Sequence, residues 1–314
     1  MATGVTYQRA VRALAQHLNC EPTERAVYQR RLATDPAEYA SAMLRATGTE
    51  LLLVDDGYPP ADIGTSWQEL GELARCPSRP VLRIERIADE ATGDALDAVR
   101  AAVSGARSRG YAALKTIAAY RGGLDLDALG PSTRGDRIEG ARMREALLAA
   151  LAANEASGDP LPVQVHTGFG DSDLLLPRAS PGYLKPLIER FRATSFVLLH
   201  CYPFVREAGW LAHVYGNVYF DLSLTIPHVS RPAAALAEAL ELAPVSKLLY
   251  ASDAARTPEL YLLAAIWWRD ALAAVLPEEL PAAAEDAARM ILRENARALY
   301  RLSGQQPAEL LQNG

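Results

Sequence analysis

The sequence predicts an α/β fold organised around a parallel sheet, and two regularities along the chain support this prediction. Short apolar runs alternate with loops rich in Gly, Pro, Asp or Ser and with amphipathic helices rich in Ala and Leu. Most of the runs are apolar almost throughout, which is typical of strands covered on both faces. The pattern is compatible with a closed parallel barrel and with a doubly wound sheet.

Seven apolar runs are expected to form the strands. They are residues 50–55, 80–87, 112–118, 162–167, 195–201, 217–222 and 247–252. The expected helices between and after them are residues 96–109, 142–154, 183–192, 205–215, 233–242, 259–275 and 283–302. Gly110, Gly158 and Gly216 follow three of these helices, at the position where a glycine commonly ends a helix.

Three further helices are expected ahead of the first strand, at residues 7–18, 23–32 and 36–45. We therefore predict an N-terminal helical insertion over residues 1–48 and one strand-and-helix domain over residues 49–314. No linker or low-complexity tract along the chain marks a second domain.

The composition is that of an ordinary globular protein able to bury a sizeable core, with 50% hydrophobic and 22% charged residues among 314. A net charge of -6, without a basic and aromatic cluster, argues against a nucleic-acid partner. The start of the chain lacks a signal-type apolar segment, and Arg269 and Asp270 interrupt the apolar stretch at 266–276. We expect a cytoplasmic protein without a membrane span, and homo-oligomer formation stays open.

Five of the predicted strands carry an ionisable residue at or near their carboxyl end. Glu85, Lys115, His166, His200 and Asp253 each follow apolar residues that would fix them on a rigid strand. The carboxyl ends of parallel strands meet at one mouth of a barrel, where such folds keep their active sites. The sequence therefore predicts that these side chains converge.

The predicted mouth offers a metal site. His166, His200 and Asp253 are of the residue types that bind a catalytic Zn²⁺ or a similar ion with one position left open for water. A bound metal would lower the pKa of that water to about 7, and Asp253 can accept its proton. Lys115 would supply a compensating positive charge or, if carbamylated, become an anionic ligand.

Three residues are candidates to contact a substrate. Arg121 can anchor an anionic group, Glu85 lies at a strand end, and His228 follows the sixth strand. Each also has a structural explanation: Arg121, for example, fits a solvated turn. Cys201 follows His200 directly, so its side chain is expected to face the helical layer, away from the mouth. Cys20, Cys76 and Cys201 are far apart and fit reduced thiols better than disulfides.

Several segments together resemble the amidohydrolase-related family, from about Leu51 to the C-terminal helix. More narrowly, they resemble the branch of nodulin-like domains found fused to glutamine synthetase. The segments are LKTIAAYRGGL (114–124), VQVHTGFGD (163–171), VLLHCYPFVREAGWLA (197–212), NVYFDLS (217–223), LYASDAARTPELYLLAAIWWRDAL (249–272) and ENARALYRL (294–302). The ordered set is far more specific than any single segment.

The resemblance implies a distorted TIM barrel that holds one or two divalent metals. The ligands in this family come from a His-x-His pair on strand 1, a residue on strand 4, histidines on strands 5 and 6, and an aspartate on strand 8. The positions in this chain that match strands 5, 6 and 8 are His166, His200 and Asp253. Lys115 lies on strand 4, where many members carry a carboxylated lysine, and Glu85 matches strand 3 less well.

One departure from the family pattern is large. None of the five histidines forms a His-x-His pair, and the seven predicted strands begin at what the family calls strand 2. We therefore predict a (β/α)8 barrel that lacks strand 1, with exposed edges on strands 2 and 8. Losing two ligands weakens metal binding. We expect DNA upstream of Met1 to encode the missing strand.

The resemblance implies a metal-dependent hydrolase that cleaves a C–N bond of a small molecule through metal-activated water, with Zn, Mn or Fe as the ion. A metal-dependent decarboxylase on the same ligands is an alternative. A barrel that lost its metal and its activity is another. A Schiff-base aldolase built on Lys115 is a third, although it leaves His166 and Asp253 without a role.

Overall fold

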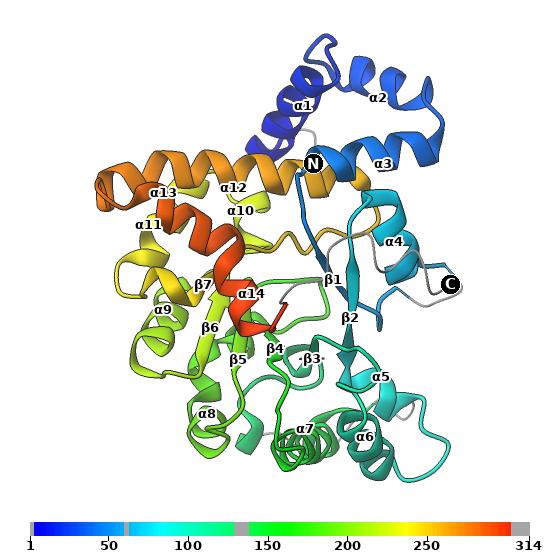
Figure 1. Cartoon of the computed structure of the whole chain (residues 1–314), viewed down its shortest axis with the longest axis vertical. Coiled ribbons are helices and arrows are strands. Elements are labelled where there is room, and N and C mark those ends of the chain that lie inside the picture. The colour runs from blue at the N-terminus through cyan, green and yellow to red at the C-terminus, as the bar shows by residue number, and fades with distance from the viewer. Residues whose placement is uncertain (1–2, 60–62, 129–137, 303–314) are drawn as a thin grey trace.

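The structure is a computed structural model, and it describes residues 3–59, 63–128 and 138–302. Within these residues one sheet contains seven parallel strands that lie side by side in the order of the chain (Figure 1). The strands are β1 (Leu52–Asp55), β2 (Ser78–Arg83), β3 (Ala113–Thr116), β4 (Val163–His166), β5 (Phe196–Leu199), β6 (Val218–Asp221) and β7 (Leu248–Leu249).

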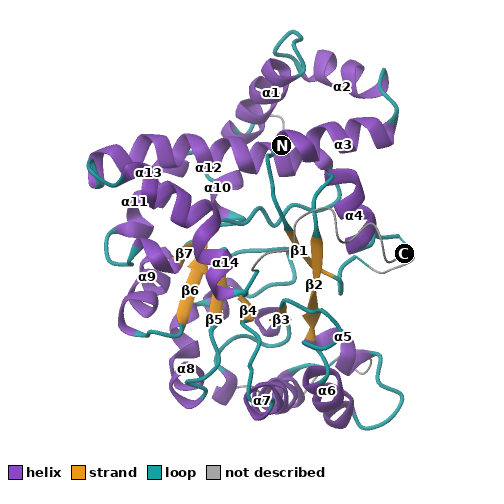
Figure 2. Ribbon diagram, in the orientation of Figure 1, coloured by secondary structure: helices purple, strands orange, loops and turns teal. Residues whose placement is uncertain are grey.

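Helices surround this sheet and connect its strands (Figure 2). They are α1 (Val5–His17), α2 (Glu24–Leu32), α3 (Pro36–Ala46), α4 (Trp67–Ala74), α5 (Ile84–Asp89), α6 (Ala95–Ser104), α7 (Gly140–Ala156), α8 (Lys185–Arg190), α9 (Val205–Val214), α10 (Thr225–His228), α11 (Pro232–Leu240), α12 (Pro258–Glu279), α13 (Ala284–Arg289) and α14 (Asn295–Leu299). A π-helical turn, Met290–Glu294, joins α13 to α14. Short 3₁₀ helices lie at Ala118–Tyr120, Leu126–Ala128, Leu176–Ala179, Pro181–Leu184 and Val245–Lys247.

The sheet curls into an open barrel. Each strand pairs with its chain neighbours, and among the described residues β1 and β7 form the two edges. A closed (β/α)8 barrel has eight parallel strands, one more than the described residues contain. The structure therefore confirms a TIM-type barrel that lacks one strand among the described residues, while the match of β1 to the family's strand 2 stays a prediction.

The period-two alternation of strand side chains decides which residues face the barrel interior. On β4, Val163 and Val165 belong to the core between the sheet and the helices. Gln164 and His166 lie between them in sequence and face the opposite way, into the cleft. On β3, Leu114 packs outward and Lys115 faces inward by the same rule. The alternation thus delivers His166 and Lys115 to one interior.

A small apolar cluster fills the barrel interior below the strand ends. Its buried members are Val81, Ala113, Val197, Leu199, Leu249 and Tyr300. Tyr300 follows α14, so the closing helical segment contributes a side chain to the interior, where Gln164 Nε2 donates a 3.1 Å hydrogen bond to the Tyr300 hydroxyl. The barrel interior is lined mainly by apolar side chains along the strands, and the ionisable side chains gather at the carboxyl ends of the strands.

The three N-terminal helices form as predicted, and α1 and α3 pack on the long helix α12. Tyr39 and Met43 of α3 are buried against Leu262 of α12. Asp35 begins α3 by accepting hydrogen bonds from the backbone N–H groups of Ala37 and Glu38, which satisfies two donors that a helix start leaves free. Residues 1–2 and 303–314 of the two predicted domain ranges lie outside the described part of the chain, and the division itself stays a prediction.

Several element predictions were wrong at their ends; the strand predicted over 247–252, for example, is observed only as Leu248–Leu249. Residues 80–87 were expected to be one strand, but β2 ends at Arg83 and α5 begins at Ile84. Apolar residues that suit a strand also suit a buried helical turn, and tertiary packing decides between them. The helix expected over 96–109 ends at Ser104, whereas Gly158, with φ +74°, follows the end of α7 as predicted for a terminal glycine.

Helix α12 is longer than expected, with 22 residues against the 17 of the predicted range 259–275. By length and composition it is the one helix of the described chain that would suffice to cross a membrane, but 56% of its most apolar window is buried inside the protein. It packs against α3 and α11. These contacts are those of a core helix, and the membrane criterion is weak evidence here.

Candidate functional site

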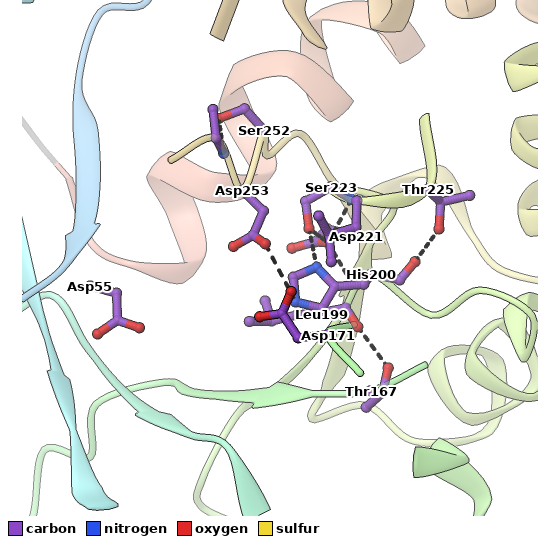
Figure 3. A network of polar contacts seen from close by, with 12 residues as sticks. Asp55, Thr167, Asp171, Leu199, His200, Asp221, Ser223, Thr225, Ser252 and Asp253 are labelled. Carbon is purple, nitrogen blue, oxygen red and sulfur yellow. Dashed lines mark hydrogen bonds and ion pairs between the residues drawn. The ribbon is translucent and has the colours of Figure 1, made fainter. Parts of the chain in front are cut away.

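A large cleft opens at the carboxyl ends of the strands and extends between the two edge strands. Its volume is about 2580 Å³. Four of the ionisable residues predicted at strand ends line it: Lys115, His166, His200 and Asp253. Figure 3 shows His200 with Asp253 on one side of its ring and Ser223 on the other, while Asp55 lies apart, across the cleft. Four of the five residues predicted to converge therefore lie at one cleft, and Glu85 does not.

His166 presents a nitrogen with no partner. Its side chain is buried, and Nε2 has no hydrogen-bond partner among the described residues. Its ring lies between Tyr120 and His200, with ring centroids 4.7 Å and 4.5 Å away. Burial, together with His200 and Lys115 nearby, lowers the pKa of His166 well below the ordinary value of 6.5. The imidazole is thus neutral at pH 7 and able to act as a ligand.

His200 repeats this arrangement on the neighbouring strand. It is buried, its Nε2 also lacks a hydrogen-bond partner within the described chain, and that atom lies 4.0 Å from Asp253 Oδ2. Burial first, then the charge of Lys115, lowers the pKa of His200 well below 6.5. Its other nitrogen, Nδ1, lies 2.6 Å from Ser223 Oγ. Two orphan nitrogens and one carboxylate therefore face a common space.

The backbone at these residues is strained. His200, Cys201 and Asp253 have φ values of +69°, +68° and +46°, in the left-handed region that residues with a Cβ rarely adopt. Such conformations cost about 1–3 kcal/mol each and persist where the surroundings hold them. At His200 the N–H donates to Asp221 Oδ1 at 2.9 Å and the carbonyl accepts from Thr225 Oγ1 at 2.6 Å. Hydrogen bonds on both sides thus fix the direction of its side chain.

Asp221 and Ser223 form a buried network behind His200. Oδ1 of Asp221 accepts from the backbone N–H of Ser223 at 2.9 Å and from the Ser223 hydroxyl at 2.7 Å, in addition to the N–H of His200. Burial raises the pKa of Asp221 to about 6, against these hydrogen bonds, which lower it. The network connects a carboxylate to the imidazole through one hydroxyl group (Figure 3).

The opposite wall of the cleft carries charges that pair with each other. Asp55 Oδ2 lies 3.1 Å from Lys115 Nζ, and the Arg83 guanidinium forms a second ion pair with the same carboxylate. Burial opposes the ionisation of Asp55, but Lys115 and Arg83 outweigh it and hold the pKa of this carboxyl below its ordinary value. The charged groups of this wall therefore already have ion-pair partners within the protein.

The three predicted substrate-contacting residues have different surroundings. Glu85 does not line the cleft: it belongs to α5, is fully buried, and its Oε1 accepts hydrogen bonds from the Thr116 hydroxyl and from the N–H of Ile117. Burial raises the pKa of Glu85. It was expected at a strand end, but the strand stops two residues earlier and the helical turn carries Glu85 away from the mouth.

Arg121 and His228 both line the cleft. Arg121 is buried and forms an ion pair with Asp89 at 2.7 Å, so its charge already has an internal partner. His228 is exposed at the end of α10, with Nδ1 2.8 Å from the carbonyl oxygen of Leu224. Cys201 is fully buried in the core outside the sheet, as predicted, and burial raises the pKa of its thiol. It is therefore not a candidate nucleophile.

Sequence reasoning missed Asp55, Asp221 and Ser223. The period-two rule would have found both carboxylates, because Leu53 and Tyr219, each two residues earlier, pack against the interior cluster. Ser223 has no such signal, since it lies beyond the end of β6.

The described side chains at the cleft are of the types that bind a divalent metal ion, but fewer of them lie close together than such an ion needs. Within residues 3–59, 63–128 and 138–302, no group of three His, Cys, Asp or Glu side chains is already close enough to hold an ion. The two orphan nitrogens and the carboxylate of Asp253 are nevertheless the ligand types that Zn²⁺ and related ions take. Buried nitrogens without partners are uncommon in folded proteins, and a bound ion satisfies them.

Comparison with known proteins places these features in a family. The family model described as Amidohydrolase matches residues 84–302. Protein fluG of Emericella nidulans (strain FGSC A4) is 40% identical over 176 residues, which cover 53% of this chain and 20% of the fungal protein. The chain thus spans about a fifth of that relative. The predicted link to domains fused to glutamine synthetase stays a prediction.

Two solved structures share the architecture. A crystal structure from Lactobacillus casei ATCC 334, provisionally named a metal-dependent hydrolase, has a TM-score of 0.82 and 29% identity, and the match covers 96% of this chain and 85% of that one. Glucuronate isomerase from Caulobacter crescentus has a TM-score of 0.51 and 15% identity over 89% of this chain and 70% of that one. The second likeness concerns the fold alone.

Proposed function

Because this chain belongs to the amidohydrolase family, we propose that it is a metal-dependent hydrolase acting on a C–N, amide-type bond of a small molecule. The family and the Lactobacillus casei neighbour support a hydrolase-type function. The substrate bond, the use of metal-activated water and the roles of individual residues are our proposals.

One observation carries this proposal. His166 and His200 each keep Nε2 buried and unpartnered on the same side of the cleft, with their rings 4.5 Å apart. Leaving one buried polar atom unsatisfied costs about 1–3 kcal/mol. Two such atoms side by side, with a carboxylate 4.0 Å from one of them, are typical of a site that is stabilised by binding something.

The residues of this chain have distinct roles in the proposed reaction. Nε2 of His166 and Nε2 of His200 would hold the ion, together with the carboxylate of Asp253. A divalent metal supplies a Lewis acid that polarises a carbonyl and lowers the pKa of water. The side chain of Asp253 is 35% exposed at the cleft, so its Oδ2 can accept a proton from water and pass it to the leaving nitrogen.

Lys115 provides positive charge at the other wall. Its Nζ lies 3.1 Å from Asp55 Oδ2, and a carbamate at that place would bring a second negative charge beside this carboxylate, so a charge-compensating role suits Lys115 better than the carbamylated ligand that the sequence left open. The ion pair between these two groups disfavours a Schiff-base aldolase, because Nζ is engaged by the Asp55 carboxylate where that reaction needs it to attack a carbonyl. Lys115 is thus placed to orient an electron-rich group of the substrate.

Metal binding is the first test. Protein dialysed against chelator should bind Zn²⁺ in isothermal titration calorimetry, and His166→Gln or His200→Gln should weaken that affinity about 100-fold, equivalent to about 2.8 kcal/mol. His213→Gln is the matched control, because His213 is exposed on α9. Binding that is the same in all four proteins would place the ion elsewhere.

Hydrolysis is the second test. Metal-loaded protein should release amine or ammonia from members of a panel of small amides, and Asp253→Asn should abolish this turnover while leaving the protein folded. Turnover retained in Asp253→Asn would refute the proton-transfer role of Asp253.

A non-catalytic barrel is the second candidate function. It is favoured by the absence of a ready-made ligand cluster among the described residues and by the cleft that opens between β1 and β7. The two tests separate the candidates, since this alternative predicts neither stoichiometric metal binding nor turnover.

A further inference from the structure

We propose that Ser223 and Asp221 are positioning residues that hold His200 in one tautomer, with the hydrogen on Nδ1 and a free lone pair on Nε2. The proposal rests on the proposed function only for the role of that lone pair, which is to bind the metal ion. The tautomer itself follows from hydrogen bonds within the chain.

The argument starts at Asp221 Oδ1. Three donors converge on this single oxygen: the N–H of His200, the N–H of Ser223 and the hydroxyl of Ser223. A carboxylate oxygen in this position accepts only, so the hydroxyl hydrogen of Ser223 points to Asp221. A serine hydroxyl has one hydrogen, and none is left to donate to the imidazole.

The next step is at His200 Nδ1, which lies 2.6 Å from Ser223 Oγ. Because the Ser223 hydrogen is committed to Asp221, Oγ can only accept in this contact, and Nδ1 must carry the hydrogen. A neutral imidazole has a single N–H, so Nε2 is left as a bare acceptor. Nε2 is the atom without a partner in the described chain and lies 4.0 Å from Asp253 Oδ2.

The opposite tautomer would be less favourable at both ring nitrogens. It would leave a bare Nδ1 facing the Ser223 oxygen, with two acceptors 2.6 Å apart, unless the hydroxyl turned away from Asp221. It would also place a hydrogen on Nε2, the atom that must bind the ion. Groups behind a metal-binding histidine commonly fix its tautomer in this way, and their loss lowers metal affinity about 10- to 100-fold.

The test uses ¹⁵N-histidine NMR on the whole, metal-free protein at pH 8. We expect the wild type to show a pyrrole-type, protonated Nδ1 and a pyridine-type Nε2 at His200, assigned by comparison with His200→Gln. In Ser223→Ala the population of His200 should shift toward the tautomer with the hydrogen on Nε2, and the Zn²⁺ affinity should fall about 10- to 100-fold. Ser223→Thr keeps the hydroxyl and should show the wild-type tautomer and the wild-type Zn²⁺ affinity.

Thr225→Val is the matched control. Thr225 also contacts His200, but its hydroxyl donates to the backbone carbonyl and not to the ring, so the tautomer should stay unchanged. A protonated Nε2 in the wild type, or a Ser223→Ala spectrum identical to the wild type, would overturn the inference. A protein with the expected tautomer that binds no Zn²⁺ would refute the proposed function and leave this inference standing.

Discussion

The two walls of the cleft treat their polar groups in opposite ways. On the wall formed by β1, β2 and β3, the charges of Asp55, Arg83 and Lys115 pair with one another. On the wall formed by β4 and β5, His166 and His200 keep buried nitrogens that no described residue satisfies. Paired charges contribute to the stability of a fold. Unpaired buried polar atoms lower the stability, and such a loss is typical of a functional site.

The largest expected effect is on the paired wall. Asp55→Ala leaves the buried Lys115 and the partly buried Arg83 without their carboxylate, and breaking such an ion pair costs up to about 3–5 kcal/mol of unfolding free energy. Urea denaturation measures the change. Asp97→Ala is the control, since its ion pair with Arg100 is exposed and should contribute less than about 1 kcal/mol. Equal losses in the two variants would remove the contrast between the walls.

On the histidine wall the sign should reverse. His166→Leu removes an unsatisfied buried nitrogen and keeps an apolar side chain in its place, so the metal-free protein should gain about 1 kcal/mol of unfolding free energy. The same denaturation experiment tests this. A loss of more than about 2 kcal/mol would mean that the imidazole is satisfied in the metal-free protein.

The depressed histidine pKa values predict a smaller, pH-dependent effect. Above pH 6.5 the imidazoles are neutral in the folded and the unfolded chain, and stability is at its full value. Below it the unfolded chain binds protons that the folded chain does not, so the free energy of unfolding falls as the pH falls.

Asp221, whose pKa is raised to about 6, titrates over the same range and acts in the opposite direction, but one carboxyl against two histidines leaves the net sign unchanged over pH 6.0–6.5. Over this range the metal-free protein should lose up to about 1 kcal/mol, measured by denaturation at several pH values. His166→Leu should reduce this slope, and a slope of the opposite sign would contradict the assigned neutral histidines.

The smallest effect is expected at Asp253. Its side chain is 35% exposed and its contact with His200 is 4.0 Å long, so Asp253→Asn should change the unfolding free energy by less than about 0.5 kcal/mol. Thermal and chemical denaturation both measure this. A large destabilisation would make Asp253 a structural residue and would undermine the interpretation of lost turnover in the same variant.

The sequence alone determined a parallel sheet whose strand ends meet, because apolar runs alternate with helices, and the resemblance to a known family selected a barrel over a doubly wound sheet. Lys115, His166, His200 and Asp253 were found by their place at the ends of those runs. Glu85 was misplaced, because the end of a strand depends on packing that a local apolar pattern does not record.

Only the tertiary structure decided how these groups are paired. Asp55 and Lys115 are 60 residues apart in sequence, yet they form an ion pair, and Ser223 meets the ring of His200 from beyond the end of another strand. Local sequence sets strand direction and the face on which a side chain lies. Contacts between distant segments decide which charges pair and which nitrogens have no hydrogen-bond partner. These contacts form only when the strands assemble into the curled sheet.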